Sequence, residues 1–89
     1  MKHNVENIRF AGRYMILRVD SMNYKADLAR ISPKLAKATK VERETYRVSP
    51  TGYGIHWPLL DEDLSVDGLV RASAPRKPEK GEALSARAR

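Results

Sequence analysis

Residues 52–69 read Gly52-Tyr53-Gly54-Ile55-His56-Trp57-Pro58-Leu59-Leu60-Asp61-Glu62-Asp63-Leu64-Ser65-Val66-Asp67-Gly68-Leu69. This stretch holds the only Trp and three consecutive acids of a chain that is otherwise rich in Lys and Arg. Tyr53, Ile55 and Trp57 recur at every second position, so we expect them to share one face of a β-strand, with His56 on the other. Pro58 ends the strand, because the residue before a proline avoids helical geometry. The sequence therefore predicts a strand that runs into an acidic bend.

A β-hairpin is predicted upstream of this strand. Residues 13–19 alternate between the two faces of a strand, and residues 24–28 alternate in the same way. Residues 20–23 between them have turn chemistry, since Asp and Asn side chains bond back to their own backbone. Residues 5–10 add a short strand before the hairpin. The residues expected to face inward on the first hairpin strand are Met15, Leu17 and Val19.

A helical segment is expected after this hairpin. Ser32 is a helix cap followed by Pro33, whose missing N–H costs nothing at the first helical position. Thr39 and Glu42 match a capping box, so either one helix bends there or a second short helix begins. The Lys residues of this segment repeat every three positions and would face solvent.

A second hairpin follows the helical segment. Residues 46–49 and 53–57 are two strands around a turn at residues 50–52, where Pro presets the first torsion and Gly supplies a positive one. Residues 64–70 fit either one helical turn capped by Ser65 or a short strand. The expected fold is therefore α+β, with a small antiparallel or mixed sheet of two hairpins and one helical segment between them.

Length and composition limit the fold to one domain. A chain of 89 residues forms a single small core, which we place at residues 1–71. Residues 72–89 contain two Pro, one Gly and a single large aliphatic residue, which is too little apolar surface to offset the cost of ordering. We expect them to form a disordered basic tail.

Several classes of protein are excluded by composition. The chain has no Cys, so it has neither disulfides nor thiolate zinc sites. Its longest apolar run, Tyr14–Leu17, is too short to span a membrane, and its start lacks a signal-peptide pattern. We expect a cytoplasmic protein without a cofactor. The net charge of +6 is spread as a basic, an acidic and a second basic zone along the chain.

The Trp57-Pro58 pair, followed by Asp61, Asp63 and Leu64, resembles the signature of a bacterial family, domain of unknown function 2442. Further supporting positions are Phe10, Gly12, Tyr14, Asp27, Leu28 and residues 35–38, and the similarity covers roughly residues 5–71. The turn at residues 20–23 departs from the Asp-Gly of the family. The resemblance implies a small α+β domain. Relatives occur in gene pairs that suggest toxin–antitoxin partners, and no catalytic residue is established for the family.

The acidic bend has a chemical and a structural interpretation. Asp61 and Asp63, with Asp67 and His56, have the residue types of a cation site, but the long ligand ladder of an EF-hand is absent. We therefore expect no metal, and we expect Asp61 or Asp63 to cap the segment that follows, with Glu62 solvated. His56 is expected to lie opposite a strand partner instead of acting as a general base. Trp57 is expected in the core, where it would bury about 200 Å².

The sequence favours a non-enzymatic interaction module, antitoxin-like or accessory, that binds a protein partner. Its expected contact residues are His56, Trp57, Asp61, Glu62 and Asp63. The alternative is a nucleic-acid-associated regulator that uses its basic face and tail, because cations that contact phosphates give affinity. The basic residues of that face are Arg9, Arg13, Arg18, Lys34, Lys37 and Lys40. Exposed sheet edges in so small a domain also allow a homodimer.

Overall fold

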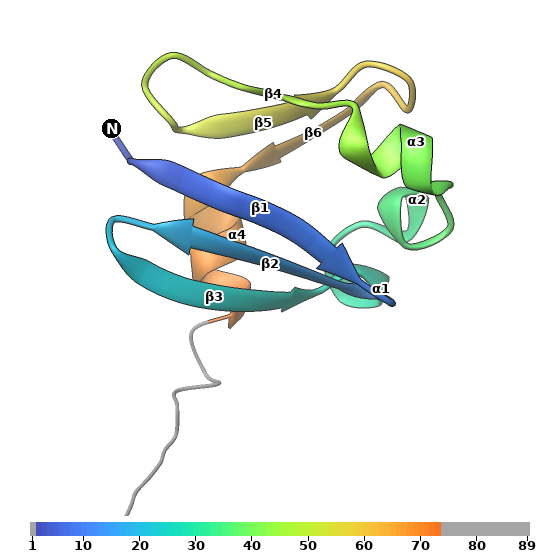
Figure 1. Cartoon of the computed structure of the whole chain (residues 1–89), viewed down its shortest axis with the longest axis horizontal. Helices are drawn as coiled ribbons and strands as arrows, with labels where there is room; N and C mark the ends of the chain where they lie inside the picture. Colours follow the sequence, from blue (N-terminus) through green and yellow to red (C-terminus); the bar gives the residue numbers. More distant parts are fainter. Residues whose placement is uncertain (1, 74–89) are drawn as a thin grey trace, which may run out of the picture.

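The computed structural model describes residues 2–73, and this part of the chain forms two three-stranded antiparallel sheets and four helices (Figure 1). The expected α+β class is confirmed. Residues 74–89, which make up most of the expected tail, lie outside the described residues. None of the described helices is long and apolar enough to cross a membrane.

Sheet A consists of β1 (Val5–Ala11), β2 (Tyr14–Val19) and β3 (Met22–Asp27), in that order. The expected alternation along β2 is confirmed by burial. Its inward residues, each at most 2% exposed, are Met15, Leu17 and Val19. The register of β1 against β2 shifts between Glu6 and Arg9, where Asn7 has a φ of 51°. This β-bulge adds one residue to the edge strand and increases its twist.

The turn between β2 and β3 is shorter than the expected residues 20–23. Val19 pairs with Met22, so only Asp20 and Ser21 connect the two strands. Both connecting residues have positive φ, 50° and 70°. Two positive φ angles are typical of the two-residue turn whose twist matches an antiparallel hairpin. The remainder of the expected turn therefore belongs to β3.

Three short helices connect the sheets: α1 (Leu28–Ile31), α2 (Pro33–Ala36) and α3 (Lys40–Glu44). The expected caps are confirmed. Ser32 Oγ accepts the Leu35 N–H at 3.2 Å at the start of α2, and Thr39 and Glu42 form the capping box of α3. Of the two alternatives at Thr39, the second short helix is therefore the correct one.

The first of these helices was not expected, because Leu28 continues the alternation of the preceding strand. The Asp27 carboxylate accepts the Ala29 N–H at 3.0 Å and begins α1 one residue after β3 ends. Leu28 remains fully buried. The alternation therefore predicted the burial of Leu28 correctly, but an Asx cap changed the backbone that carries it.

Sheet B consists of β4 (Arg47–Val48), β5 (Gly54–Trp57) and β6 (Glu62–Ser65). The pairing of β4 with β5 is the expected second hairpin. The start of β6 at residues 62–63 was not predicted, because three consecutive acids are more typical of a solvated bend. Asp61, whose φ is 51°, reverses the chain so that Glu62 pairs with Trp57. Asp61 therefore forms the turn before β6, and Asp63 lies within this strand. The expectation that one of them caps the following segment is wrong.

α4 (Val66–Ser73) follows β6 directly. Ser65 Oγ accepts the Gly68 N–H at 2.9 Å, so Ser65 is the cap that one of the alternatives for residues 64–70 proposed. The other alternative also holds in part, since β6 extends through Ser65. The helix continues to Ser73, beyond the domain boundary expected at residue 71.

One core joins both sheets and α4, which passes behind the strands of sheet A in Figure 1. Trp57 is fully buried there, and its indole Nε1 donates to the Arg43 carbonyl oxygen at 2.9 Å. Its ring also lies 6.3 Å from the ring of Tyr46. The core interpretation of Trp57 is confirmed. The remaining buried apolar residues are Met15, Leu17, Val19, Ala26, Leu28, Leu35, Ile55, Val66 and Leu69.

Candidate functional site

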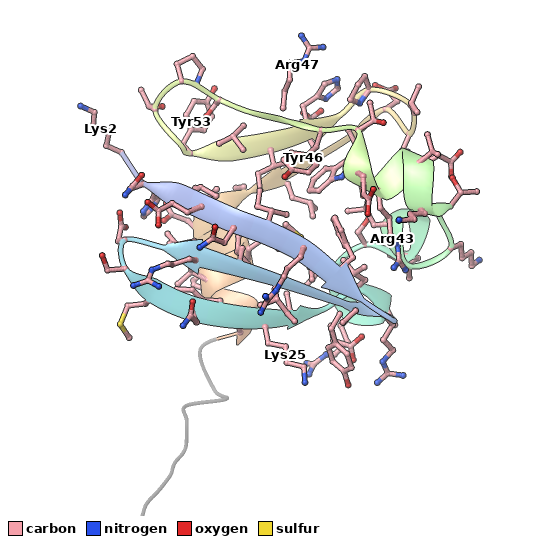
Figure 2. The ribbon with its side chains drawn as sticks, viewed as in Figure 1. Lys2, Lys25, Arg43, Tyr46, Arg47 and Tyr53 are labelled. Atoms are coloured by element: carbon pink, nitrogen blue, oxygen red, sulfur yellow. The ribbon has the colours of Figure 1, made fainter. Side chains whose placement is uncertain are left out.

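The outward face of sheet B carries a row of three charged or titratable side chains. Arg47 on β4 pairs with His56 on β5, and His56 pairs with Asp63 on β6. His56 Nδ1 lies 2.8 Å from Asp63 Oδ1, so the expected cross-strand partner of His56 is this carboxylate. Figure 2 shows Arg47 projecting away from the body of the protein. The row presents a cation at one end and a carboxylate at the other.

A hollow lies beside this row, over a glycine. Ser49 donates its backbone N–H to the Gly54 carbonyl at 2.9 Å, and Ser65 pairs with Gly54 from the other side. Because Gly54 has no side chain, the centre of this second row is empty. The resulting open hollow has a volume of about 680 Å³, within the range of ligand pockets. We call the two rows, with the hollow between them, the outer face of sheet B; its residues are Arg47, Ser49, Gly54, His56, Asp63 and Ser65.

Tyr53 forms part of the rim of the hollow and is 60% exposed. The sequence placed it on the inward face with Ile55 and Trp57. That expectation is wrong for Tyr53, because β5 begins only at Gly54 and residue 53 still belongs to the turn. An exposed Tyr beside a hollow is a residue type that is enriched in protein interfaces.

The structure divides the expected contact residues between two locations. His56 and Asp63 lie together on the outer face of sheet B. Trp57 and Glu62 point toward the protein instead: Trp57 is buried, and Glu62 Oε2 accepts the Ser32 hydroxyl at 2.5 Å. The expectation that Glu62 is solvated is therefore wrong. Asp61 forms the tight turn before β6, and its carbonyl lies 3.4 Å from Lys34 Nζ.

The six expected nucleic-acid-contacting residues fall into two groups. Arg9 and Arg18 lie on sheet A and Arg13 on its first turn. The group of the helical segment is Lys34, Lys37 and Lys40. Several of these cations already have partners: Arg13 lies 2.9 Å from Asp27, and Lys34 donates to the Leu60 carbonyl at 3.1 Å.

Sequence reasoning missed His3, which joins parts of the chain that are far apart. Its Nδ1 lies 2.7 Å from Asp20 Oδ2, and its Nε2 lies 2.7 Å from Asp67 Oδ1. Its backbone N–H also donates to the Thr51 carbonyl at 2.8 Å. His3 thus connects the N-terminal segment to the β2–β3 turn and the start of α4 through its imidazole, and to the β4–β5 turn through its backbone. No local sequence pattern predicts these contacts, because the partner Asp67 is 64 residues away from His3.

Two carboxylates on one imidazole favour its protonated form, since only imidazolium donates from both nitrogens. The hydrogen bond to Asp20, followed by the hydrogen bond to Asp67, raises the pKa of His3 above 6.5. The same bond from His3, with the backbone N–H of Asn4, lowers the pKa of Asp20 below 3.8. Each carboxylate faces a different ring nitrogen, and residues 2–73 contain no cluster of three or more His, Cys, Asp or Glu arranged to hold a metal ion.

Comparison with known proteins identifies a family but no function. The model of the family described as "Protein of unknown function (DUF2442)" matches residues 5–75. The comparisons found no match among characterised proteins and none among solved structures. Because the match covers most of the sequence, the chain belongs to the DUF2442 family.

Proposed function

We propose that this protein is a non-enzymatic interaction module that binds a protein partner through the outer face of sheet B. The observation that carries this proposal is the hollow over Gly54, bordered by the charged row and by the exposed Tyr53. Interfaces combine an apolar pocket, an aromatic anchor and a polar rim. Acting within the cytoplasm as the antitoxin or accessory half of a pair would suit a domain of this size.

The geometry supports binding over catalysis. His56 and Asp63 form two members of a possible acid–base set, but a nucleophile would need to stand within hydrogen-bond reach of the imidazole. One candidate is Ser49, whose Oγ accepts the backbone N–H groups of Tyr53 at 3.0 Å and Gly54 at 3.1 Å. These bonds support a role for Ser49 in holding the β4–β5 turn.

Co-purification with the native partner tests the proposal. The tagged full chain is recovered from its host alongside two single variants, Tyr53→Ala on the rim and Leu59→Ala elsewhere. Both residues are exposed large apolar side chains, 60% and 56% respectively, so they form a matched pair. We expect a protein that is retained by wild type and Leu59→Ala and lost from Tyr53→Ala. Retention that is equal in all three, or a chain that elutes as a monomer alone, would contradict the proposal.

A second candidate function is supported by the outer face of sheet A. Arg9 and Lys25 lie on either side of Ile16, on neighbouring strands, and Arg18 follows on the same face of β2. Figure 2 shows Lys25 projecting on the opposite side of the molecule from Arg47. Such a basic face would contact phosphates, with an affinity that falls steeply as salt increases. Retardation of duplex or single-stranded nucleic acid at low salt that Arg9→Ala and Lys25→Ala weaken would support this function, and no retardation would end it.

A further inference from the structure

The hollow over Gly54 has an apolar wall, which decides what kind of side chain fits it. Pro50 and Tyr53 contribute apolar surface to its lining, whereas Val48 and Leu64, which also border it, pack inward against the core. A Cβ on Gly54 would meet only the Leu64 carbonyl oxygen, at 3.6 Å, an ordinary contact. The fold therefore does not require this position to be empty for packing. The opening instead leaves a recess into which a large apolar side chain fits.

One end of the hollow is cationic. Arg47 lines it, and within residues 2–73 no carboxylate lies at ion-pair distance from the guanidinium. The closest acid in the strand pairing is Asp63, which stands across two strand spacings, about 10 Å away. Asp63 is bonded to His56, which lies between them. Arg47 can therefore accept an external carboxylate, which its planar fork binds through two parallel hydrogen bonds.

We propose that the outer face of sheet B binds an acidic, apolar segment of the partner, which inserts one large apolar side chain over Gly54 and places a neighbouring carboxylate on Arg47. This inference rests on the proposed function and specifies the chemistry of the partner. The charge at Arg47 selects against a basic segment, which Arg47 would repel and only Asp63 would attract. Gly54 lies diagonally across from Arg47, two residues along β5 from its partner His56, so the two anchors come from positions close together in the partner sequence.

Selection from a random linear peptide library tests the inference without knowledge of the partner. The displayed library is panned against the full chain and counter-selected against Gly54→Val, which fills the recess. We expect enriched peptides in which Asp or Glu stands within one or two positions of Phe, Trp, Leu or Ile. Their affinity for Arg47→Glu should fall by about tenfold or more, and Tyr53→Ala should weaken them as well. Leu59→Ala, outside the recess, should bind as wild type does.

Other outcomes overturn the inference. Enrichment of Lys- and Arg-rich peptides, or of apolar peptides that bind Arg47→Glu unchanged, would show that Arg47 selects nothing. No enrichment over the counter-selection target would show that the recess binds no peptide. Because Arg47→Glu and Tyr53→Ala alter exposed side chains only, they keep the test decisive even where Gly54→Val fails to fold.

The native partner separates this inference from the proposed function. Where Tyr53→Ala releases the co-purified partner but Arg47→Glu does not, the interaction face stands and its preference for a carboxylate is wrong. Where neither variant releases the partner, the proposed function fails together with the inference.

Discussion

Sheets A and B share one topology, yet they differ in how their outward faces are filled. Sheet A has strands of six or seven residues, and its outward side chains contact one another. Lys25 Nζ lies 4.5 Å from the centre of the Tyr14 ring, and Arg13 pairs with Asp27. Sheet B has strands of two to four residues, a glycine at its centre and an Arg47 without a carboxylate partner in the described residues. A short sheet that leaves a cation and a recess open is better suited to an external ligand than a sheet on which Lys25 and Arg13 already contact neighbouring side chains.

The inward faces of the two sheets differ in the size of the side chains that they bury. Sheet B, the shorter sheet, supplies the largest core residue. Trp57 comes from β5, which has only four residues, whereas β2 supplies three smaller buried side chains. Few backbone hydrogen bonds join the strands of sheet B, so its place in the fold depends on side-chain burial. The two faces of sheet B thus have separate tasks, packing on the inside and recognition on the outside.

The largest expected effect comes from removing the inward anchor of sheet B. We expect Trp57→Ala to destabilise the protein by about 3–5 kcal/mol, since the cavity adds to the lost transfer free energy. Tyr53→Ala, which truncates an exposed side chain directly before the same strand, should cost about 0.5 kcal/mol or less. Urea denaturation of both variants measures the difference. Equal losses would mean that the inner and outer faces of sheet B are not distinct.

The turns of the two sheets each contain a glycine with a positive φ, and the two glycines differ in how much space surrounds them. Gly12, with a φ of 59°, lies in the β1–β2 turn of sheet A, and an added Cβ there meets nothing within 4 Å. Gly52, with a φ of 72°, lies in the β4–β5 turn, and an added Cβ would collide with the His3 carbonyl.

We expect Gly12→Ala to cost about 1 kcal/mol, the price of the backbone conformation alone. Gly52→Ala should cost about 2–4 kcal/mol, because the N-terminal segment must also move. Chemical denaturation compares the stability of the two variants. The exchange rate of the His3 backbone amide hydrogen reports whether the N-terminal segment is displaced. A smaller loss for Gly52→Ala than for Gly12→Ala would contradict the close approach of His3.

The third prediction concerns pH, through the His3 contacts that join both sheets to α4. The raised pKa of His3 means that its contribution to stability is complete below pH 6.5 and is lost as the pH rises through the higher native value. The lowered pKa of Asp20 means that its contribution is complete above pH 3.8 and is lost as the pH falls through the lower native value. Stability from this cluster is therefore greatest between these two values.

The variant His3→Gln keeps a polar side chain but removes the titration. We expect the urea midpoint of the wild-type protein to decrease as the pH rises from 6 to 9. The urea midpoint of His3→Gln should change less over the same range. His56→Gln, which alters the other histidine and its Asp63 contact, serves as the control and should retain the wild-type dependence. Parallel pH profiles for wild type and His3→Gln would show that the protonated form of His3 does not contribute to stability.

The last prediction concerns Gly54→Val on the outer face of sheet B, for which we expect only a small effect on stability. Because an added Cβ meets only the Leu64 carbonyl at 3.6 Å, and because Val suits a strand, we expect the free energy of unfolding to change by about 1 kcal/mol or less. Binding through the hollow should nevertheless be lost. Thermal unfolding measures the first effect and partner retention the second. A variant that unfolds readily would show that Gly54 serves the fold and not a ligand.

Local features of the sequence determined the elements whose chemistry lies within a few residues. The alternation along β2 predicted its buried face, the Ser32, Thr39 and Ser65 hydroxyls marked where three helices begin, and the Trp57-Pro58 signature indicated the family. Each of these signals depends on the spacing of neighbours along one strand or one helical turn, so a single sequence is sufficient to read it.

Only the tertiary structure decided the features that join residues far apart in the chain. β6 forms because β5 offers its backbone to an acidic segment, and Glu62 turns inward because Ser32 lies there to donate. His3 becomes an imidazolium bridge because folding brings Asp20 and Asp67 to its two nitrogens. The hollow over Gly54 likewise exists only once three strands pair around a glycine. Contacts across long sequence separations leave no local pattern, and in this protein they position both the candidate binding face and the cluster that holds the sheets together.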